Sequence, residues 1–279
     1  MAFAELFWRR LVHRFLEDIL ARRRKRIEEV KRLASAPIGD ASARTPLADP
    51  VAALRGSGGF IIAEVKRRSP SKGAIAPDAD AALLARAYER GGAAAVSVLC
   101  EPDFFGGSRA DVQSVAKAIA VPVLCKDFIL DPIQLQMARA DGARWALLIA
   151  RVLGGDLAVM IRETYLAGLE PLVEAHEERE LADAVTAGAR ILGINARDLD
   201  TFEVDLNRVK RLLPLCPSNC VCVAESGLRG AEDLLDLRDA GAHGFLVGET
   251  LMRNPDPEGL LRHFLRELNP EPPRMEALP

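Results

Sequence analysis

The stretch EPLVEAHEERELADAVTAGARILGIN (residues 170–195) contains one complete strand–helix–strand unit. Its two apolar runs, EPLV at 170–173 and RILGI at 190–194, have the length of buried strands. Between them, ERELADAVTAGA at 178–189 has the residue pattern of a helix and ends in Gly-Ala, a common signal for a helix C-terminus. This stretch therefore predicts two parallel strands joined by a helix that covers them.

The same unit recurs on both sides of this stretch. Further apolar runs are candidate strands: FIIAEV (60–65), AAVSVL (94–99), VPVL (121–124), WALLIA (145–150), VCVA (221–224) and GFLV (244–247). Stretches with helical patterning lie between them, including DAALLARAYERGG (80–92), PIQLQMARADGA (132–143) and GAEDLLDLRDAGA (230–242). Apolar strands that alternate with helices in this number predict an α/β protein of the (β/α)8 class, the TIM barrel. A doubly wound open sheet is the alternative, but no GxGxxG motif follows the first strand.

The N-terminal part of the chain has a different character. Residues 1–35 space apolar residues as a helix does, and residues 36–58 carry the Pro, Gly, Ser and Asp typical of a connecting segment. The basic run at 22–26 is flanked by acidic residues, so we expect a solvated amphipathic face rather than a nucleic-acid patch. The predicted organisation is an N-terminal helical extension and linker (1–58), a catalytic barrel (59–268) and a disordered tail (269–279).

The composition limits the location and the partners of the protein. The 279 residues are 49% hydrophobic and 28% charged, which suits one large α/β domain. A net charge of −3 gives no basis for binding nucleic acid or an anionic membrane, and no apolar run approaches the roughly 18 residues of a membrane span. The five cysteines are expected to be reduced thiols, and Cys216, Cys220 and Cys222 are not expected to form a metal cluster. We therefore expect a cytoplasmic protein, with a monomer and a weak homodimer both left open.

Polar side chains are concentrated at the ends of the predicted strands, where a barrel places its chemistry. From the first strand to the last they are Glu64, Lys66 and the segment 69–73, Lys126-Asp127-Phe128, Glu174, Asn195 and Arg197, Glu225-Ser226-Gly227, and Gly248-Glu249. Each charge taken alone is compatible with a fixed ion pair inside the barrel. Burying the whole set would be costly unless the residues form a site, so they predict a binding mouth at one end of the barrel.

The residues at this mouth indicate the kind of ligand that it binds. Ser226-Gly227 and Gly248-Glu249-Thr250 have the placement of a barrel phosphate site, where backbone N–H groups receive an anion. Two lysines next to carboxyl and amide groups suit acid–base chemistry on a phosphosugar. Phe104, Phe105 and Phe128 are candidate apolar walls for an aromatic ring. No HExxH motif or histidine cluster indicates a metal, and no lysine environment demands pyridoxal phosphate, so we expect a reaction without cofactors.

The strand-end residues belong to longer motifs that are specific when taken together. These motifs are IIAEVKRRSPSKG (61–73), EPDFFGGS (101–108), PVLCKDFILD (122–131), LVEAH (172–176), LGINARDLDTFEVD (192–205), VAESGL (223–228) and FLVGETLMR (245–253). Their order and composition resemble the indole-3-glycerol-phosphate synthase family from about residue 15 to 265. The resemblance implies a carboxy-lyase of tryptophan biosynthesis. Its substrate would be 1-(2-carboxyphenylamino)-1-deoxyribulose 5-phosphate, which becomes indole-3-glycerol phosphate with loss of CO2 and water.

The resemblance also implies roles for the charged residues. Lys126 matches the general acid that acts on the sugar carbonyl and its hydroxyl, and Glu174 matches the late general base. Lys66 matches the lysine that binds the anthranilate carboxylate, although its division of the acid role with Lys126 stays open. Glu64 matches a carboxylate that orients both lysines.

The remaining matched positions bind the substrate. Asn195, Arg197, Glu225 and Ser226 match residues that hold the ring and the sugar hydroxyls; Ser69, Gly227, Gly248 and Glu249 match the phosphate region; Phe105 and Phe128 match the clamp on the aromatic ring. By analogy, the N-terminal helix is expected to pack over the mouth and help to bind substrate. Its alternative role is to plug the barrel.

Two other functions remain to be weighed against the synthase. A phosphoribosylanthranilate isomerase would need a Cys/Asp pair on the first and sixth strands, which carry Glu64-Lys66 and Asn195-Arg197 here. A catalytically silent barrel would be favoured by loss of Lys126 or Glu174, and both are present. Departures from the family pattern include Cys100, Cys125, Ala196 and Arg144-Trp145, and none of them removes a residue with an implied catalytic role. Because Cys125 precedes Lys126, we expect it to be a point of oxidation sensitivity.

Overall fold

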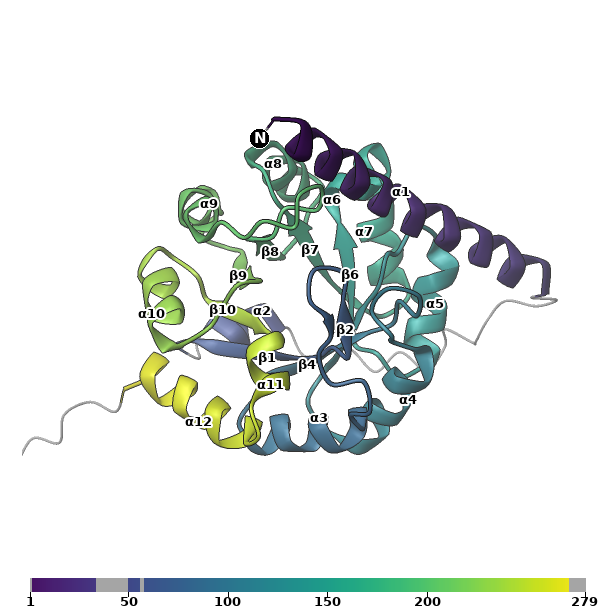
Figure 1. The fold of residues 1–279 in the computed structure, drawn as a ribbon. Coiled ribbons are helices and arrows are strands. Elements are labelled where there is room, and N and C mark those ends of the chain that lie inside the picture. The colour runs from purple at the N-terminus through teal and green to yellow at the C-terminus, as the bar shows by residue number, and fades with distance from the viewer. Residues whose placement is uncertain (1, 34–49, 56–57, 271–279) are drawn as a thin grey trace, which may run out of the picture.

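Parallel strands close into a barrel in the computed structural model, which describes residues 2–33, 50–55 and 58–270. The barrel strands are β1 (Phe60–Val65), β4 (Ala95–Leu99), β5 (Val123–Lys126), β6 (Trp145–Ile149), β7 (Glu170–Ala175), β8 (Ile191–Asn195), β9 (Val221–Glu225) and β10 (Gly244–Val247). They lie in the order β1-β10-β9-β8-β7-β6-β5-β4, and β1 pairs in parallel with both β4 and β10 (Figure 1). A short antiparallel pair, β2 (Arg68–Ser69) and β3 (Gly73–Ala74), follows β1. The predicted (β/α)8 barrel is therefore confirmed.

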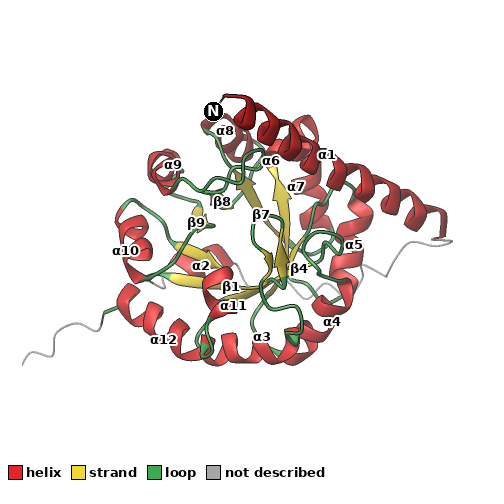
Figure 2. Cartoon of the chain, in the orientation of Figure 1, coloured by secondary structure: helices red, strands yellow, loops and turns green. Residues whose placement is uncertain are grey.

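Helices cover the outside of the barrel (Figure 2). They are α3 (Ala81–Arg90), α4 (Arg109–Ala118), α5 (Pro132–Ala140), α6 (Ala150–Leu153), α7 (Leu157–Leu166), α8 (Glu178–Thr186), α9 (Leu206–Leu212), α10 (Ala231–Asp239), α11 (Glu249–Arg253) and α12 (Pro257–Leu268), with 3-10 turns η1 (Gly154–Asp156) and η2 (Leu213–Leu215). Side-chain caps set several of their starts. Asp80 accepts hydrogen bonds from the backbone of α3, and Asp131 forms a capping box with Gln134 in α5.

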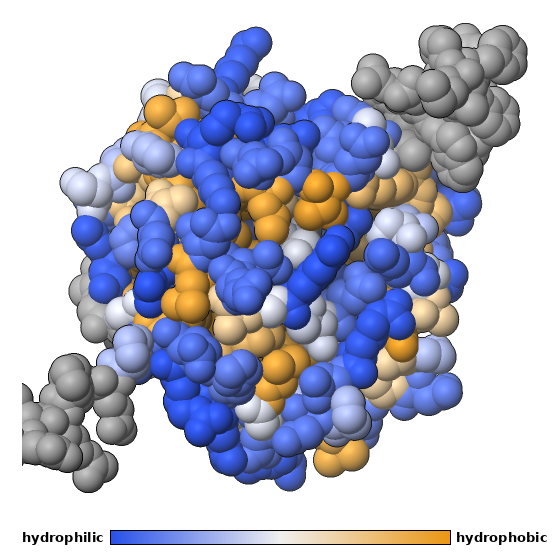
Figure 3. Space-filling model, turned by 60° about the vertical axis from the view of Figure 1, so that its left-hand side comes forward, coloured by the Kyte–Doolittle hydropathy of each residue, from blue (hydrophilic) through white to orange (hydrophobic). Residues whose placement is uncertain are grey.

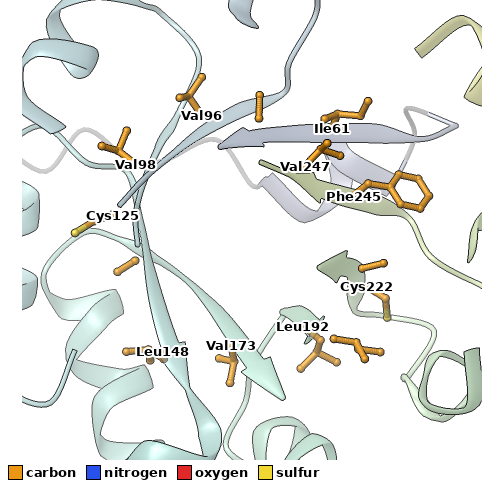
Figure 4. Packing of buried hydrophobic residues seen from close by; sticks show 14 of the residues in the cluster. Ile61, Val96, Val98, Cys125, Leu148, Val173, Leu192, Cys222, Phe245 and Val247 are labelled. Carbon is orange, nitrogen blue, oxygen red and sulfur yellow. The ribbon is translucent and has the colours of Figure 1, made fainter. Parts of the chain in front are cut away.

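Two hydrophobic layers arise because successive strand residues point to opposite sides of the sheet. Outward residues such as Ile61, Val173 and Phe245 pack against the helices and form the larger cluster (Figure 4). The alternate residues, such as Ile62 and Leu172, fill the barrel interior. On β1 this alternation places Glu64 on the inward side, two residues beyond Ile62, and the same logic applies to the polar ends of the other strands.

The N-terminal region agrees with the sequence prediction in part. Helix α1 (Ala2–Leu33) confirms the expected helix. The expected connecting segment, residues 36–58, contains the short helix α2 (Pro50–Arg55), which the sequence analysis did not predict. Val51 and Leu54 of α2 are buried in the interior cluster of the barrel, and this tertiary packing accounts for a helix too short to be read from its pattern. Residues 34–49 and 56–57, and the tail from 271 onward, lie outside the described residues.

The basic run on α1 is only partly the solvated face that the sequence predicts. Arg22, Arg24 and Lys25 are exposed as expected. Arg23 and Arg26 are not, because they pair with carboxylates of the loops at the barrel mouth. The flanking acidic residues on the helix itself gave no sign of these distant partners. The basic run therefore holds α1 against the barrel.

The surface is mainly polar on the face drawn in Figure 3, with hydrophobic residues in small separate groups. The large exposed hydrophobic side chains of the described residues are Leu33, Leu83, Val159, Leu166, Val204 and Leu215, of which only Val159 and Leu166 share an element, helix α7. Within the described ranges, no helix combines the length and the apolar character needed to cross a bilayer. The same part of the chain contains no His, Cys, Asp or Glu group arranged to hold a metal ion, so Cys216, Cys220 and Cys222 form no such cluster.

Candidate functional site

A cavity of about 700 Å³ lies at the carboxyl ends of the barrel strands. Its lining includes nearly all of the residues that the sequence singles out: Glu64, Lys66, Ser69, Phe105, Lys126, Phe128, Glu174, Asn195, Arg197, Ser226, Gly227, Gly248 and Glu249. Phe104 and Glu225 are exceptions, and Glu225 lies beneath the lining in contact with Lys126. A volume of this size accommodates one substrate of drug-like dimensions.

Lys126 lies among three carboxylates at the base of this cavity. Its Nζ is 2.6 Å from Glu225 Oε2, 3.5 Å from Glu174 Oε2 and 3.9 Å from Glu64 Oε2. Glu64 in turn accepts from Lys66, with Oε1 2.7 Å from Lys66 Nζ. The three carboxylate side chains are at most 3% exposed, so solvent does little to weaken these interactions. The strand ends of β1, β5, β7 and β9 therefore contribute to one ion cluster.

The electrostatics of the cluster follow from burial and from this excess of carboxylates. Burial disfavours the Lys126 ammonium, but Glu225, Glu174 and Glu64 outweigh it and raise the pKa of Lys126. Burial and repulsion from the neighbouring carboxylates raise the pKa of Glu225 to about 7, against the opposing effect of Lys126. For Glu64 and Glu174, burial also acts upward, but the nearby cations prevail and lower the pKa of both groups. Glu225 is consequently the carboxyl closest to half-protonation at neutral pH.

Gly193 on β8 provides the space that the Glu225 carboxylate occupies. A Cβ atom added at Gly193 would lie 2.1 Å from Glu225 Oε1 and 2.8 Å from Leu172 Cδ2. We expect Gly193→Ala to displace Glu225 from Lys126 and to destabilise the protein by about 1–3 kcal/mol, the usual cost of overpacking. Urea unfolding measures the change, with Gly155→Ala as control because a Cβ there meets nothing within 4 Å. Equal unfolding midpoints for the two variants would show that Glu225 moves aside freely.

The end of the cavity near β1, β9 and β10 is suited to an anion. Ser69 Oγ is buried and has no hydrogen-bond partner in the described structure. Ser226 and Gly227 both have positive φ values, 68° and 78°, which turn the chain sharply after β9. Gly248 lets the backbone pass close to the ion cluster, since a Cβ there would lie 2.5 Å from Glu64 Oε1. An unpartnered hydroxyl beside backbone segments that turn sharply or pass close to the ion cluster is an arrangement suited to phosphate.

The opposite side of the cavity is aromatic. The rings of Phe105 and Phe128 lie 6.4 Å apart, centroid to centroid, and both line the cavity as expected. Phe104 does not line it, because its ring packs edge-on against Phe15 of α1 with centroids 4.6 Å apart. Glu101, which sequence reasoning missed, accepts the backbone N–H groups of residues 103, 104 and 105 and so shapes the loop that carries these rings.

Helix α1 closes part of the mouth. Phe15, Leu16 and Ile19 line the cavity from this helix, which agrees with the expected packing over the mouth. Arg23 anchors it, with Nη2 2.5 Å from Oδ1 of Asp127, the residue after Lys126. Both side chains of this pair are about nine-tenths buried. Burial raises the pKa of Asp127 to about 6 although Arg23 opposes the shift.

Cys125 does not point into the mouth. It belongs to the outward side of β5, and its Sγ lies 3.4 Å from Sγ of Cys100, which follows β4. The contact with Cys125 and burial both raise the pKa of Cys100. Both thiols are free and buried, so little of Cys100 is present as the reactive thiolate. The expected sensitivity of Cys125 to oxidation stays a prediction.

Sequence reasoning also missed His176 and Glu180. His176 is buried directly after β7, with Nε2 3.4 Å from Oε1 of Glu174 and Nδ1 3.3 Å from Oε2 of Glu180. The motif LVEAH contains the histidine, but a strand-end position alone does not reveal whether it faces the cavity or lies behind it. The spacing of four residues between His176 and Glu180, across the start of α8, could have indicated that the two side chains are in contact.

The chain is similar to known proteins over most of its length. The family model described as indole-3-glycerol phosphate synthase matches residues 16–264. Over 232 residues the chain is 49% identical to the indole-3-glycerol phosphate synthase of Streptomyces griseus. This alignment covers 82% of this chain and 86% of the relative. Over 214 residues it is 51% identical to indole-3-glycerol phosphate synthase 1 of Streptomyces coelicolor, and this alignment covers 76% of this chain and 80% of the relative.

A solved structure with a similar fold is thiamine phosphate pyrophosphorylase from Pyrococcus furiosus. It has a TM-score of 0.57 and 15% identity, and the match covers 77% of this chain and 99% of that one. At this identity the likeness supports the barrel fold alone. The family match and the two close relatives confirm the resemblance found in the sequence motifs, and the chain belongs to the indole-3-glycerol phosphate synthase family.

Proposed function

We propose that the chain catalyses ring closure of 1-(2-carboxyphenylamino)-1-deoxyribulose 5-phosphate to indole-3-glycerol phosphate, with loss of CO2 and water and without a metal or cofactor. The observation that carries this proposal is the position of Lys126 between the carboxylates of Glu174 and Glu225 at the base of the cavity. An ammonium acid beside a carboxylate base is what a closure with one protonation and one deprotonation requires. Family membership supplies the substrate class.

Lys126 acts as the general acid at the start of the reaction. As the aromatic carbon that bears the carboxylate bonds to C2′ of the sugar chain, the C2′ carbonyl oxygen takes a proton from the Lys126 ammonium. Departure of CO2 then restores the aromatic ring. The carboxylates around Lys126, which raise its pKa, keep it protonated for this step, and substrate binding must loosen its 2.6 Å contact with Glu225 before the proton moves.

Glu174 acts as the general base in the second half. After the lysine acid has regained a proton from solvent, the hydroxyl on C2′ takes up that proton and leaves as water. Glu174 removes the proton on C1′, and the electron pair of this C–H bond forms the double bond of the indole. The lowered pKa of Glu174 supports this role because the group is ionised at neutral pH. Asn195 provides a hydrogen bond to the same carboxylate and fixes its orientation.

The other cavity residues bind and orient the substrate. Lys66, held by Glu64 at 2.7 Å, binds the anthranilate carboxylate and shares the acid role with Lys126 in a division that kinetics must assign. The phosphate is received by the Ser69 hydroxyl and by the backbone N–H groups at Gly227, Gly248 and Glu249, while Phe105 and Phe128 clamp the aromatic ring. Arg197, Ser226 and Glu225 complete the contacts, with Glu225 acting through Lys126. Fixing both ends of the substrate brings the reacting carbons together and lowers the entropic part of the barrier.

A fluorescence assay tests this function. Purified protein is incubated with the proposed substrate in buffer that contains a chelator, and formation of the indole product is followed by its emission. Turnover without added metal or cofactor supports the proposal. A folded protein that binds the substrate and releases no indole product would instead be a silent barrel.

The ion pair between Arg23 and Asp127 links α1 to the acid-bearing loop, so we expect Arg23→Ala to raise KM about tenfold, equivalent to ~1.4 kcal/mol of lost binding. The increase in KM should be smaller below pH 6, because Asp127, with a pKa of about 6, then takes up a proton and its ion pair with Arg23 is weakened in the wild type as well. Steady-state kinetics at pH 5.5 and pH 8 measure the effect. Arg24→Ala, an exposed position on the same helix, is the matched control. An unchanged KM in Arg23→Ala would show that this ion pair is not needed for substrate binding.

We also propose that the reaction takes place in the cytoplasm. The substrate is a small phosphorylated metabolite, and the net charge of −3 offers no attraction to nucleic acid or to anionic membranes.

The oligomeric state of the protein has two expected values, a monomer and a weak homodimer. Sedimentation of the full chain distinguishes them.

A further inference from the structure

The two carboxylate oxygens of Glu174 face two different basic groups. Oε2 lies 3.5 Å from Lys126 Nζ, on the side of the cavity. Oε1 lies 3.4 Å from Nε2 of His176, a ring that is 2% exposed and does not line the cavity. The reaction proposed above uses Lys126 and Glu174 but gives His176 no task.

Glu180 fixes the imidazole of His176 in place. One oxygen of this carboxylate, Oε2, accepts the backbone N–H of His176 at 2.7 Å and lies 3.3 Å from ring Nδ1. These two contacts lock the ring between the end of β7 and the first turn of α8. The remaining ring nitrogen, Nε2, is buried and makes no hydrogen bond of good geometry in the described structure, and the acceptor it faces is Glu174. Burying a polar nitrogen in this way is costly unless it interacts with that charge.

The charges around this ring favour its protonated form. Burial acts against the imidazolium, but the hydrogen bond to Glu180 and the negative charges of Glu174 and Glu180 outweigh it and raise the pKa of His176. Glu225, from β9, adds to the same effect. Arg151, from α6, faces Glu180 and helps to lower its pKa, although burial acts in the opposite direction. Burial acts to raise the pKa of Glu174, but the charges of Lys126 and His176 and side-chain hydrogen bonds with Asn195 and Glu225 outweigh it. Glu64 is a further carboxylate that interacts with Glu174.

We propose that His176 is a positioning residue for Glu174, and that Glu180 holds it as an imidazolium which keeps the base ionised and leaves Oε2 turned toward the cavity. This inference rests on the proposed role of Glu174 as general base. The pair would extend the pH range of the base downward, since a neighbouring positive charge stabilises the carboxylate. His176 touches no substrate in this arrangement and acts only through Glu174.

The pH dependence of kcat tests the proposal. His176→Asn removes the charge but keeps a polar side chain, and Glu180→Gln removes the charge that holds the imidazolium. In both variants the acid limb of the kcat profile should move about one unit to higher pH, because an opposite charge within about 4–6 Å lowers a carboxyl pKa by about 1–3 units. The kcat plateau above that limb should return to within a few-fold of wild type. Glu178→Gln is the matched control, because Glu178 is an exposed carboxylate at the first position of α8. It should leave the acid limb of the kcat profile unchanged.

A second readout does not depend on turnover. Proton NMR follows the four histidines of the chain, and the signal absent from His176→Asn identifies His176. Its pKa should lie above that of an ordinary histidine in the wild type and should fall in Glu180→Gln and in Glu174→Gln. Glu178→Gln should not change it.

The outcomes separate the two proposals. If the wild type turns over substrate but both variants lose kcat equally at all pH values, His176 is a structural residue and the inference is overturned while the proposed function stands. If the wild type has no activity, the proposed function fails, and the NMR titration still tests whether Glu180 and Glu174 raise the pKa of His176. A His176 pKa that is unchanged in Glu180→Gln and Glu174→Gln would overturn the inference in either case.

Discussion

Replacing Lys126 by alanine is expected to lower kcat by about 10³-fold, within the range of roughly 10²–10⁴ that a positioned acid contributes. Lys126 is the ammonium in contact with Glu174 and Glu225, and the variant leaves no comparable acid at that position. The assay is the fluorescence measurement described above, with purified and folded protein. A rate near that of the wild type would show that Lys126 is not the acid and would transfer the role to Lys66.

The stability of this variant should depend on pH in a defined direction. Without Lys126, the pKa values of Glu64, Glu174 and Glu225 all rise, since the cation that lowers them is gone. Carboxyl groups with raised folded-state pKa values stabilise the fold at low pH, and that contribution is lost as the pH rises through those values. Lys126→Ala should therefore unfold at lower urea concentration at pH 8.5 than at pH 6, relative to wild type. Lys126→Met, which fills the space without a charge, should show the same trend and separates charge from cavity effects.

Glu174→Gln is expected to reduce kcat by a similar factor while leaving substrate affinity within a few-fold of wild type. Glutamine keeps the size of the side chain and can still bond to Asn195, but it takes up no proton in the dehydration. Single-turnover kinetics and equilibrium binding together measure the two effects. Retention of most of the wild-type kcat would assign the base to another group, and Glu225, with a pKa of about 7, would be the next candidate. Glu177→Gln, exposed beside the start of α8, is the control.

Much of the fold and of the cavity lining could be predicted because both depend on local patterns. The apolar runs of the predicted strands end in polar residues, and parallel strands in a barrel bring those ends together. The pairing of Lys126 with Glu225 could not be predicted in this way. It joins β5 to β9, and which carboxylate meets the lysine depends on the register across the barrel and on the space left by Gly193.

Other misses have equally physical causes. Helix α2 is too short to form a helix by itself and is held by the burial of Val51 and Leu54. Arg23 and Arg26 of α1 were assigned to solvent because their own helix supplies acidic neighbours, whereas their partners lie on loops more than 70 positions away. Local sequence patterns indicate which face of a helix or strand is apolar or charged, but they do not indicate which residues of another element will contact that face.

The pairing of β1 with β10 has a consequence for synthesis of the protein on the ribosome. The first barrel strand to emerge remains without its second neighbour until the last strand has been translated. Until then, the nascent chain exposes an unpaired strand edge, which is a template for association with other chains. Glu64 and Lys66, carried on that strand or just after it, meet Gly248 only when the ring closes. Chains released before β10 is complete should therefore be both inactive and prone to aggregate.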